Sequence, residues 1–157
     1  MIPLKKFLAF RPAILIVEDE VLVLLAIADC LRDYGFQVIE ACSGDVTMVV
    51  LQSTVAVDLV FTDVQMPGEC DGFVLARWLH AERPGLPVLI TAGGPTNAAM
   101  AKELCGKEPF FAKPYDVARV VSHIRVLGIR RPLFERARQS RTEKGQYRRQ
   151  SSRQTTR

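Results

Sequence analysis

The sequence predicts an α/β fold built on a mostly parallel sheet. Short apolar runs and helical patterns alternate along the chain, and three of the apolar runs end on charged residues. Ile14–Val17 runs into three acidic residues, Leu59–Thr62 runs into Asp63, and Phe110–Ala112 runs into Lys113. Short apolar runs are typical of strands buried on both faces. Strands that alternate with helices are typical of a parallel sheet covered by helices on both faces.

Five strand–helix units follow one another, and the sequence contains no internal repeat. Gly35 stops the first helix, and acidic or hydroxyl residues begin several others, as helix ends require. The predicted strands are Ile14–Val17, Phe36–Ala41, Leu59–Thr62, Val88–Thr91 and Phe110–Ala112. The predicted helices run from Val21 to Tyr34, from Ser43 to about Ser53, from Asp71 to about Glu82, from Pro95 to about Leu104, and from Asp116 to Leu127.

The composition indicates one domain and a cytoplasmic location. The chain has 157 residues and is 48% hydrophobic, which suits a single domain with its own core. Its apolar runs are far shorter than the ~20 residues of a membrane span. The short run Phe7–Phe10 does not make a secretory signal. The four cysteines include no C-x-x-C pair, so we expect reduced thiols rather than a metal site or a disulfide framework.

The charge is divided unevenly between the body of the chain and its end. Residues 1–128 contain 11 basic and 15 acidic side chains, a net charge of −4, whereas residues 129–157 contain 10 basic and 2 acidic side chains. The second stretch has few apolar residues and cannot offset its ordering entropy by burial. We therefore predict an N-terminal extension at 1–12, a folded domain at 13–128, and a basic, disordered tail at 129–157.

The charged strand ends predict a site for a cation and a phosphoryl group. Glu18, Asp19 and Asp63 would meet at the carboxyl edge of the sheet, where open α/β sheets bind ligands. Two like charges at ~4 Å repel by about 4 kcal/mol at an effective dielectric constant of ~20. A cluster of carboxylate oxygens relieves this repulsion by binding a cation, and it suits Mg²⁺.

Lys113 and Thr91 complete this predicted site. Lys113 adds a positive charge at a neighbouring strand end, and Thr91 adds a hydroxyl group. A carboxylate nucleophile with a divalent cation, a lysine and a hydroxyl group can form and hold an acyl phosphate. Each residue alone also suits an ordinary role, such as a turn, a first-turn acid or a surface lysine. Their joint placement at successive strand ends favours the site.

The chain resembles the receiver domain of two-component response regulators over residues 13–127. The resemblance implies a five-stranded parallel sheet of order 2-1-3-4-5, doubly wound like flavodoxin. It covers five short segments in the order expected for that family. These are Ile16-Val17-Glu18-Asp19-Glu20, Thr62-Asp63-Val64-Gln65-Met66-Pro67, Asp71-Gly72, Thr91-Ala92 and Lys113-Pro114.

The resemblance also implies a role for each site residue. Asp63 matches the phosphorylated aspartate, Asp19 the direct Mg²⁺ ligand, and Glu18 the partner acid that acts through water. The backbone carbonyl of Gln65 would complete the metal site. Thr91 and Lys113 match the groups that hold the phosphoryl oxygens. Phe110 falls at the position of the aromatic switch, with Thr91 as its partner.

These roles imply a stand-alone phospho-accepting regulator rather than a turnover enzyme. Its partners would be a histidine kinase or phosphotransfer protein, and a downstream protein on the face of the fourth helix, fifth strand and fifth helix. We expect His80 and His123 to be surface residues, so that the phosphodonor histidine belongs to another protein.

Two alternatives remain open. The basic tail could bind nucleic acid or an acidic partner, although residues 129–157 are too few and too polar for a helix-turn-helix domain. The chain could also act as a phosphorylation-independent scaffold or a phosphate sink.

Three other classes of protein fit the sequence poorly. A flavin protein would meet a repulsive acidic loop, a dehalogenase-type phosphatase would need an acid at Gln65, and a nucleotide enzyme would need a P-loop.

Overall fold

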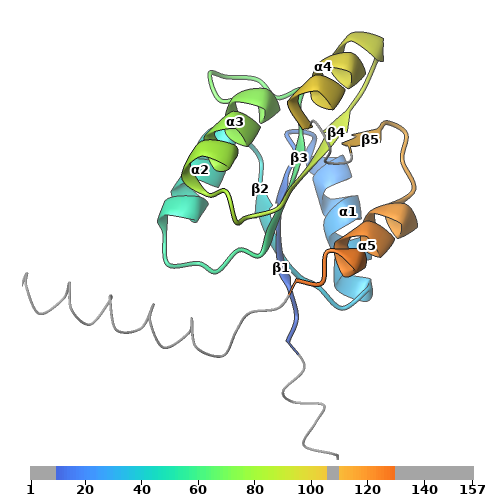
Figure 1. The fold of residues 1–157 in the computed structure, drawn as a ribbon. Helices are drawn as coiled ribbons and strands as arrows, with labels where there is room; N and C mark the ends of the chain where they lie inside the picture. Colours follow the sequence, from blue (N-terminus) through green and yellow to red (C-terminus); the bar gives the residue numbers. More distant parts are fainter. Residues whose placement is uncertain (1–9, 106–109, 130–157) are drawn as a thin grey trace, which may run out of the picture.

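The computed structural model of the chain describes residues 10–105 and 110–129. These residues form one five-stranded parallel sheet of strand order β2-β1-β3-β4-β5 with helices on both faces (Figure 1), which confirms the predicted fold. The first residues of the predicted N-terminal extension and nearly all of the predicted tail lie outside the described residues. The strands are β1 Ala13–Val17, β2 Gln37–Ala41, β3 Leu59–Asp63, β4 Val88–Ala92 and β5 Phe110–Ala112.

The helices divide between the two faces of the sheet. Three of them, α2, α3 and α4, cover one face, and α1 and α5 cover the other (Figure 1). Among the described residues, no helix is both long enough and apolar enough to cross a membrane. The helices are α1 Val21–Asp33, α2 Gly44–Gln52, α3 Gly72–Glu82, α4 Pro95–Cys105 and α5 Val117–Val126.

The core lies on both sides of the three central strands. Every residue of β1, β3 and β4 is buried, because helices cover both faces there. Side chains alternate between the two layers: Leu15 and Val60 face the α2–α3–α4 side, whereas Ile14 and Phe61 face the α1–α5 side. The edge strand β2 is less covered, and its first residue, Gln37, is exposed.

Three helices begin at residues whose side chains accept a backbone hydrogen bond. The caps are Ser43 for α2, Asp71 for α3 and Asp116 for α5, and each is typically worth about 0.5–2 kcal/mol. The donors are the N–H groups of Val46 at 3.2 Å, Val74 at 2.9 Å and Ala118 at 2.9 Å. The caps fix where each helix begins, so they also fix the lengths of the loops that surround the carboxyl edge of the sheet.

Small differences from the predicted boundaries lie at element ends. Helix α1 ends at Asp33 instead of Tyr34, because Gly35 adopts a φ of 94°, which ends the helix. Strand β3 includes Asp63, whose neighbour Val64 continues the pairing by donating its N–H to the carbonyl of Thr91 at 3.0 Å. Asp63 is therefore held by the sheet itself rather than by a turn.

The strand order places the carboxyl ends of β1 and β3 side by side. The chain leaves β1 for β2 on one side of the sheet and later returns to β3 on the other side. Ligands of open α/β sheets bind at such a reversal of strand order. The register pairs Val17 of β1 with Thr62 of β3, so Glu18 and Asp63 follow at equivalent positions.

Candidate functional site

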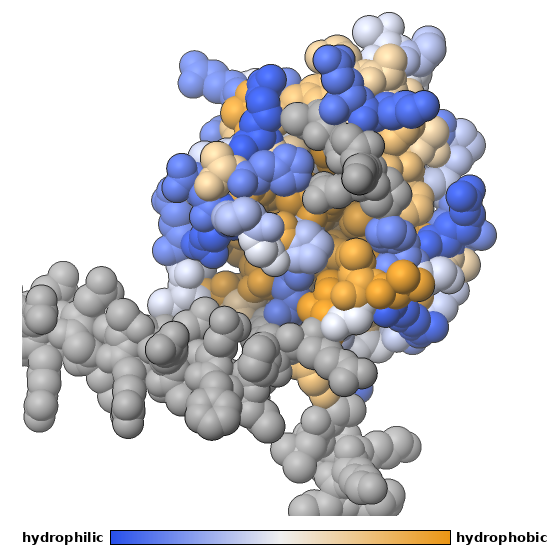
Figure 2. All heavy atoms as spheres, in the orientation of Figure 1, coloured by the Kyte–Doolittle hydropathy of each residue, from blue (hydrophilic) through white to orange (hydrophobic). Residues whose placement is uncertain are grey.

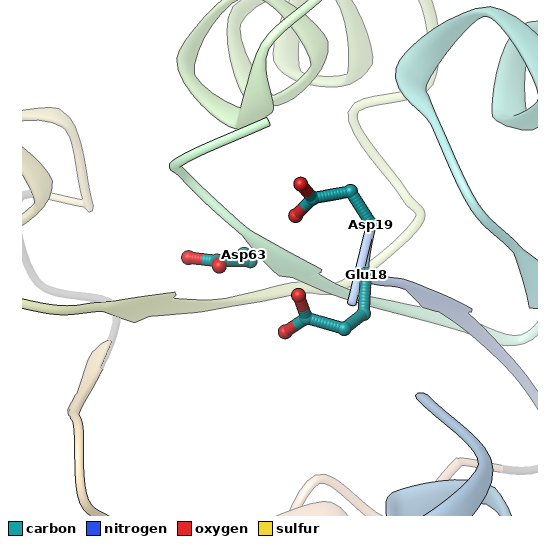
Figure 3. A group of neighbouring side chains, drawn as sticks. All are labelled: Glu18, Asp19 and Asp63. Carbon is teal, nitrogen blue, oxygen red and sulfur yellow. The ribbon is translucent and has the colours of Figure 1, made fainter. Parts of the chain in front are cut away.

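Three carboxylates meet at the carboxyl edge of the sheet. Glu18 and Asp19 follow β1, and Asp63 is the last residue of β3. One oxygen atom from each carboxylate lies within 4.8 Å of the others. Figure 3 shows the three groups pointing to the same side of the strand ends. Glu18 and Asp63 are only 2% and 5% exposed, so two of the negative charges are largely shielded from water.

Lys113 reaches this cluster from the end of β5. Its Nζ donates hydrogen bonds to Asp63 Oδ2 at 2.7 Å and to Glu18 Oε2 at 3.2 Å. The lysine side chain is 28% exposed, whereas both carboxylates are buried. The ammonium group thus offsets part of the repulsion between the two acids, and the side chains of three separate strand–loop junctions form one ionic network.

Burial and neighbouring charges shift the pKa values of Glu18 and Lys113 in different ways. Burial raises the pKa of Glu18, and the charge of Asp63 adds to that effect, although the N–H of Glu20 and the charge of Lys113 oppose it. Burial lowers the pKa of Lys113, but its hydrogen bond with Asp63 and the charges of both acids outweigh burial and raise that pKa overall. The site therefore keeps its lysine protonated while it disfavours the ionised form of Glu18.

Thr91 and Gln65 lie beside Asp63. Thr91 is buried at the register position opposite Asp63 in the neighbouring strand β4. The N–H of Gln65 donates to Asp63 Oδ1 at 3.2 Å, while its own side chain is exposed. Small residues follow Thr91: a side chain on Gly93 would first meet Gln65 Oε1, at 3.7 Å.

Two glycines hold the loop that follows Asp63. A Cβ atom on Gly72 would lie 2.0 Å from the carbonyl oxygen of Asp63 and 2.5 Å from Cα of Val64. A Cβ atom on Gly44 would lie 2.1 Å from the carbonyl oxygen of Cys70. The first turns of α2 and α3 therefore pack directly against the backbone of this loop. These close contacts were not predictable, since a close approach of two backbones has no signal in the sequence.

Tyr115 lies near the site, although its sequence position alone did not predict this. Its ring packs edge-on against Phe61 at 5.7 Å and against Phe111 at 6.4 Å, measured between ring centroids. Burial, together with the charges of Glu18 and Asp63, raises the pKa of Tyr115. The only indication in the sequence was that Tyr115 lies two residues after Lys113, the charged residue at the end of the predicted strand Phe110–Ala112.

His80 and His123, which the sequence predicts to be surface residues, are half-buried instead of fully exposed. The ring of His123 packs edge-on against Phe111, with the ring centroids 6.1 Å apart. Its Nε2 atom is buried and has no hydrogen-bond partner within the described part of the chain. Helical periodicity places His123 on the outward side of α5, but it does not reveal that β5 covers that position.

Phe110, the predicted switch residue, is half-buried on the opposite face of the sheet, the one covered by α2, α3 and α4.

The residues at the carboxyl edge fit a magnesium ion. The cluster offers carboxylate oxygens, and Asp19 is more accessible than its two neighbours. Hard divalent cations prefer oxygen ligands, and Mg²⁺ keeps several waters, which an accessible site permits. The cysteines whose surroundings are described, Cys30, Cys42 and Cys70, are free thiols, and none joins the cluster.

Comparison with known families gives a match over most of the folded region. The family described as the response regulator receiver domain matches residues 14–125. Among curated proteins, a probable transcriptional regulatory protein of Picosynechococcus is 28% identical over 138 residues, which is 83% of this chain and 54% of that protein. The transcriptional regulatory protein ZraR of Salmonella typhimurium is 32% identical over 108 residues, 68% of this chain and 24% of that protein. The chain thus spans about half, or less, of the length of these relatives.

Solved structures show the same architecture. The receiver domain of a signal transduction histidine kinase from Syntrophus aciditrophicus superposes with a TM-score of 0.67 at 28% identity, covering 77% of this chain and 94% of that one. A response regulator receiver protein from Sinorhizobium medicae gives a TM-score of 0.64 at 28% identity, covering 71% of this chain and 90% of that one.

Proposed function

This chain belongs to the response regulator receiver family, and from that premise we propose that it accepts a phosphoryl group on Asp63. One observation carries the proposal. The Asp63 carboxylate is buried at a strand end, between two further acids and a lysine whose ammonium group is 2.7 Å away. A structural aspartate would not need two acidic neighbours beside it. The family is one of signalling domains rather than turnover enzymes.

The proposed step transfers a phosphoryl group from a phosphohistidine of a partner protein. A carboxylate oxygen of Asp63 attacks phosphorus, so that a P–O bond forms and the P–N bond breaks. The electron pair of the broken bond stays on the imidazole nitrogen, which then takes a proton from water. Lys113 turns from the Asp63 carboxylate to a phosphoryl oxygen, and the hydroxyl group of Thr91 donates to another.

Glu18, Asp19, Asp63 and the backbone carbonyl of Gln65 would hold Mg²⁺ next to the phosphoryl group. The ion would neutralise negative charge on the transferring oxygens. The role of this chain's own residues is to keep three oxygen donors together despite their mutual repulsion, which Lys113 reduces while no ion is bound.

Phosphorylation would be read out at the face formed by α4, β5 and α5. Thr91 pairs with Phe111, the residue after Phe110 in β5, so a shift of Thr91 toward the phosphoryl group would act on the strand that carries Phe110. The phosphodonor would be a histidine kinase or a phosphotransfer protein. A downstream protein would bind the changed face. These partners place the chain in the cytoplasm.

Intact-mass measurement after incubation with Mg²⁺ and acetyl phosphate tests the proposal. We expect one phosphoryl adduct, which is absent without the metal and absent in Asp63→Asn. Asp45→Asn serves as the matched control, because Asp45 is an exposed aspartate close to the same edge, in the first turn of α2. An adduct that persists in Asp63→Asn would move the site to another residue. No adduct under any of these conditions would instead support a phosphorylation-independent module.

A further inference from the structure

The ion pair of Asp63 and Lys113 lies next to a layer of aromatic side chains. Alternate residues of a strand share one face of the sheet. Phe61 lies two residues before Asp63 in β3, and both rings that concern us here are on the face covered by α1 and α5. Phe111 lies two residues before Lys113, at the end of β5. Tyr115 packs edge-on against both rings, with its centroid 5.7 Å from that of Phe61 and 6.4 Å from that of Phe111.

Lys113 has to reach across a strand to make its ion pairs. Strand β4 lies between β5 and β3 in the sheet. The N–H of Lys113 donates to the carbonyl of Ala92 in β4 at 2.9 Å, which continues the pairing of β5 with β4. Its Nζ nevertheless lies 2.7 Å from Asp63 Oδ2 in the strand beyond. The separation of β5 from β3 therefore decides whether the ammonium group meets the carboxylate.

The end of β5 is thinly covered. The strand has only three residues and forms an edge of the sheet, and its two phenylalanines are half-buried. Figure 2 shows hydrophobic residues at the surface on the side of the molecule where α5 lies, and Val126 of that helix is 82% exposed. The ring of Tyr115 supplies a contact that spans β4 and connects the loop after β5 directly to β3.

We propose that Tyr115 is a positioning residue, whose ring sets the separation of Asp63 and Lys113 across β4. Tyr115 lies two residues after Lys113 in the same loop, so a shift of the ring relative to Phe61 displaces the backbone of the lysine. The inference rests on the proposed function, because Lys113 is the group that would turn to a phosphoryl oxygen.

The surroundings of the Tyr115 phenol agree with this role. Burial, together with the charges of Glu18 and Asp63, raises the pKa of the phenol, so the side chain stays neutral and adds no charge to the ionic network. The contacts that connect Tyr115 to β3 and β5 are made by its ring. The ring, rather than the hydroxyl group, should therefore carry the positioning.

NMR of the lysine ammonium groups in the metal-free protein tests the positioning directly. The Lys113 hydrogens, held by two buried carboxylates, should exchange slowly with water, whereas those of the exposed Lys102 should exchange fast. We expect Lys113 exchange to become roughly tenfold faster in Tyr115→Leu, because hydrogen bonds to charged groups are lost. Tyr115→Phe, which keeps the ring, should exchange like the parent. The matched control is Phe36→Leu, which removes a ring from the same core cluster at the opposite edge of the sheet.

The rate of phosphoryl uptake from acetyl phosphate and Mg²⁺ gives a second readout. Tyr115→Leu should slow uptake roughly tenfold, since displacing a reacting group by about 1 Å can cost as much as a hundredfold in rate. In a Lys113→Met background the same change should have little further effect, because the group that Tyr115 positions is then absent. Equal rate losses in both backgrounds would mean that Tyr115 acts independently of Lys113, and would overturn the inference.

Urea titration verifies that each variant is folded before either measurement. If Tyr115→Leu does not fold, Phe61→Leu removes the other ring of the pair and takes its place, with the same expected results. Unchanged exchange of the Lys113 hydrogens in the folded variant would contradict the inference. Exchange that is equally fast in Tyr115→Phe would assign the effect to the hydroxyl group, and equally fast exchange in Phe36→Leu would assign it to general loosening of the core. Either result would also contradict the inference.

The exchange measurement needs no phosphorylation, so it separates this inference from the proposed function. Faster Lys113 exchange in Tyr115→Leu, with no phosphoryl adduct on the parent protein, would leave Tyr115 as the residue that positions the ionic network and remove the function. An adduct on the parent protein, with unchanged exchange in Tyr115→Leu, would leave the function standing and remove the inference.

Discussion

At the level of single residues, Lys113 decides the charge balance of the site. Two buried carboxylates share its ammonium group, at 2.7 Å and 3.2 Å. A buried ion pair adds little net stability, but removing one partner leaves an uncompensated charge, which is costly. Lys113 therefore acts as a resident counter-charge that a bound cation can replace.

Replacing Lys113 by Met should destabilise the metal-free protein by about 1–3 kcal/mol at neutral pH, because Glu18 and Asp63 then repel each other without a neutralising group. Millimolar Mg²⁺ should restore most of the lost stability. Urea unfolding of both proteins with and without Mg²⁺ measures the effect. An equal loss of stability in the presence of Mg²⁺ would show that the metal does not occupy this cluster.

Glu18 gives the site a pH dependence whose direction follows from its burial. Its pKa in the folded protein is raised above the ordinary value of 4.5. Below that value Glu18 is protonated in both the folded and the unfolded chain. As the pH rises from 4.5 through the raised pKa, the unfolded chain loses its proton first, so the stability that Glu18 contributes is lost.

Comparison with Glu18→Gln isolates this contribution. Without metal, the parent protein should lose stability relative to Glu18→Gln as the pH rises above 4.5, and Mg²⁺ should reverse that trend. Urea midpoints at several pH values provide the measurement. Parallel pH profiles for the two metal-free proteins would mean that Glu18 ionises as easily in the folded chain as in the unfolded one.

At the level of elements, the loop after β3 is fixed by the first turns of α2 and α3. Gly72 donates its N–H to the carbonyl of Val64 at 3.2 Å, and it leaves no room for a side chain against Asp63. The start of α3 therefore determines where the backbone of Asp63 lies.

Gly72→Ala should slow phosphoryl uptake by about tenfold or more, since displacing a reacting group by about 1 Å can cost as much as a hundredfold in rate. Alanine favours a helix over glycine by about 1 kcal/mol, so any loss must arise from the clash with Asp63. The rate is measured from the time course of the phosphoryl adduct, on protein whose folding is verified by denaturant titration. Gly85→Ala is the control, because Gly85 is exposed and a Cβ there meets nothing within 4 Å. A folded Gly72→Ala protein with the parent rate would contradict this role.

The elements also show what sequence patterns can and cannot predict. Strands and helices were predictable because apolar periodicity is local, and Glu18, Asp63 and Lys113 could be brought together because parallel strands end at one edge. The placement of Tyr115 and His123 was not predictable. Their environment depends on how β5 packs against α5, and a single sequence carries no signal for that packing. The close contact at Gly72 is likewise a distance between backbones, which residue types do not encode.

At the level of the whole molecule, charge separates two surfaces. The carboxyl edge of the sheet collects Glu18, Asp19 and Asp63, whereas α5 carries arginines on an otherwise acidic body. A phosphodonor would approach the first surface, and a downstream partner would bind the second. The rings of Tyr115 and Phe111 form a chain of contacts from Phe61, two residues before Asp63, to His123 of α5.

The central claim is that Asp63 itself carries the phosphoryl group, and mapping the modified residue tests it most directly. The protein is phosphorylated with acetyl phosphate and Mg²⁺, and the acyl phosphate is reduced with borohydride, which converts the modified aspartate to homoserine. Peptide mass spectrometry then locates the change. The account predicts homoserine at position 63 and nowhere else. Homoserine at another aspartate, or an unchanged Asp63 in protein that carries the adduct, would contradict it.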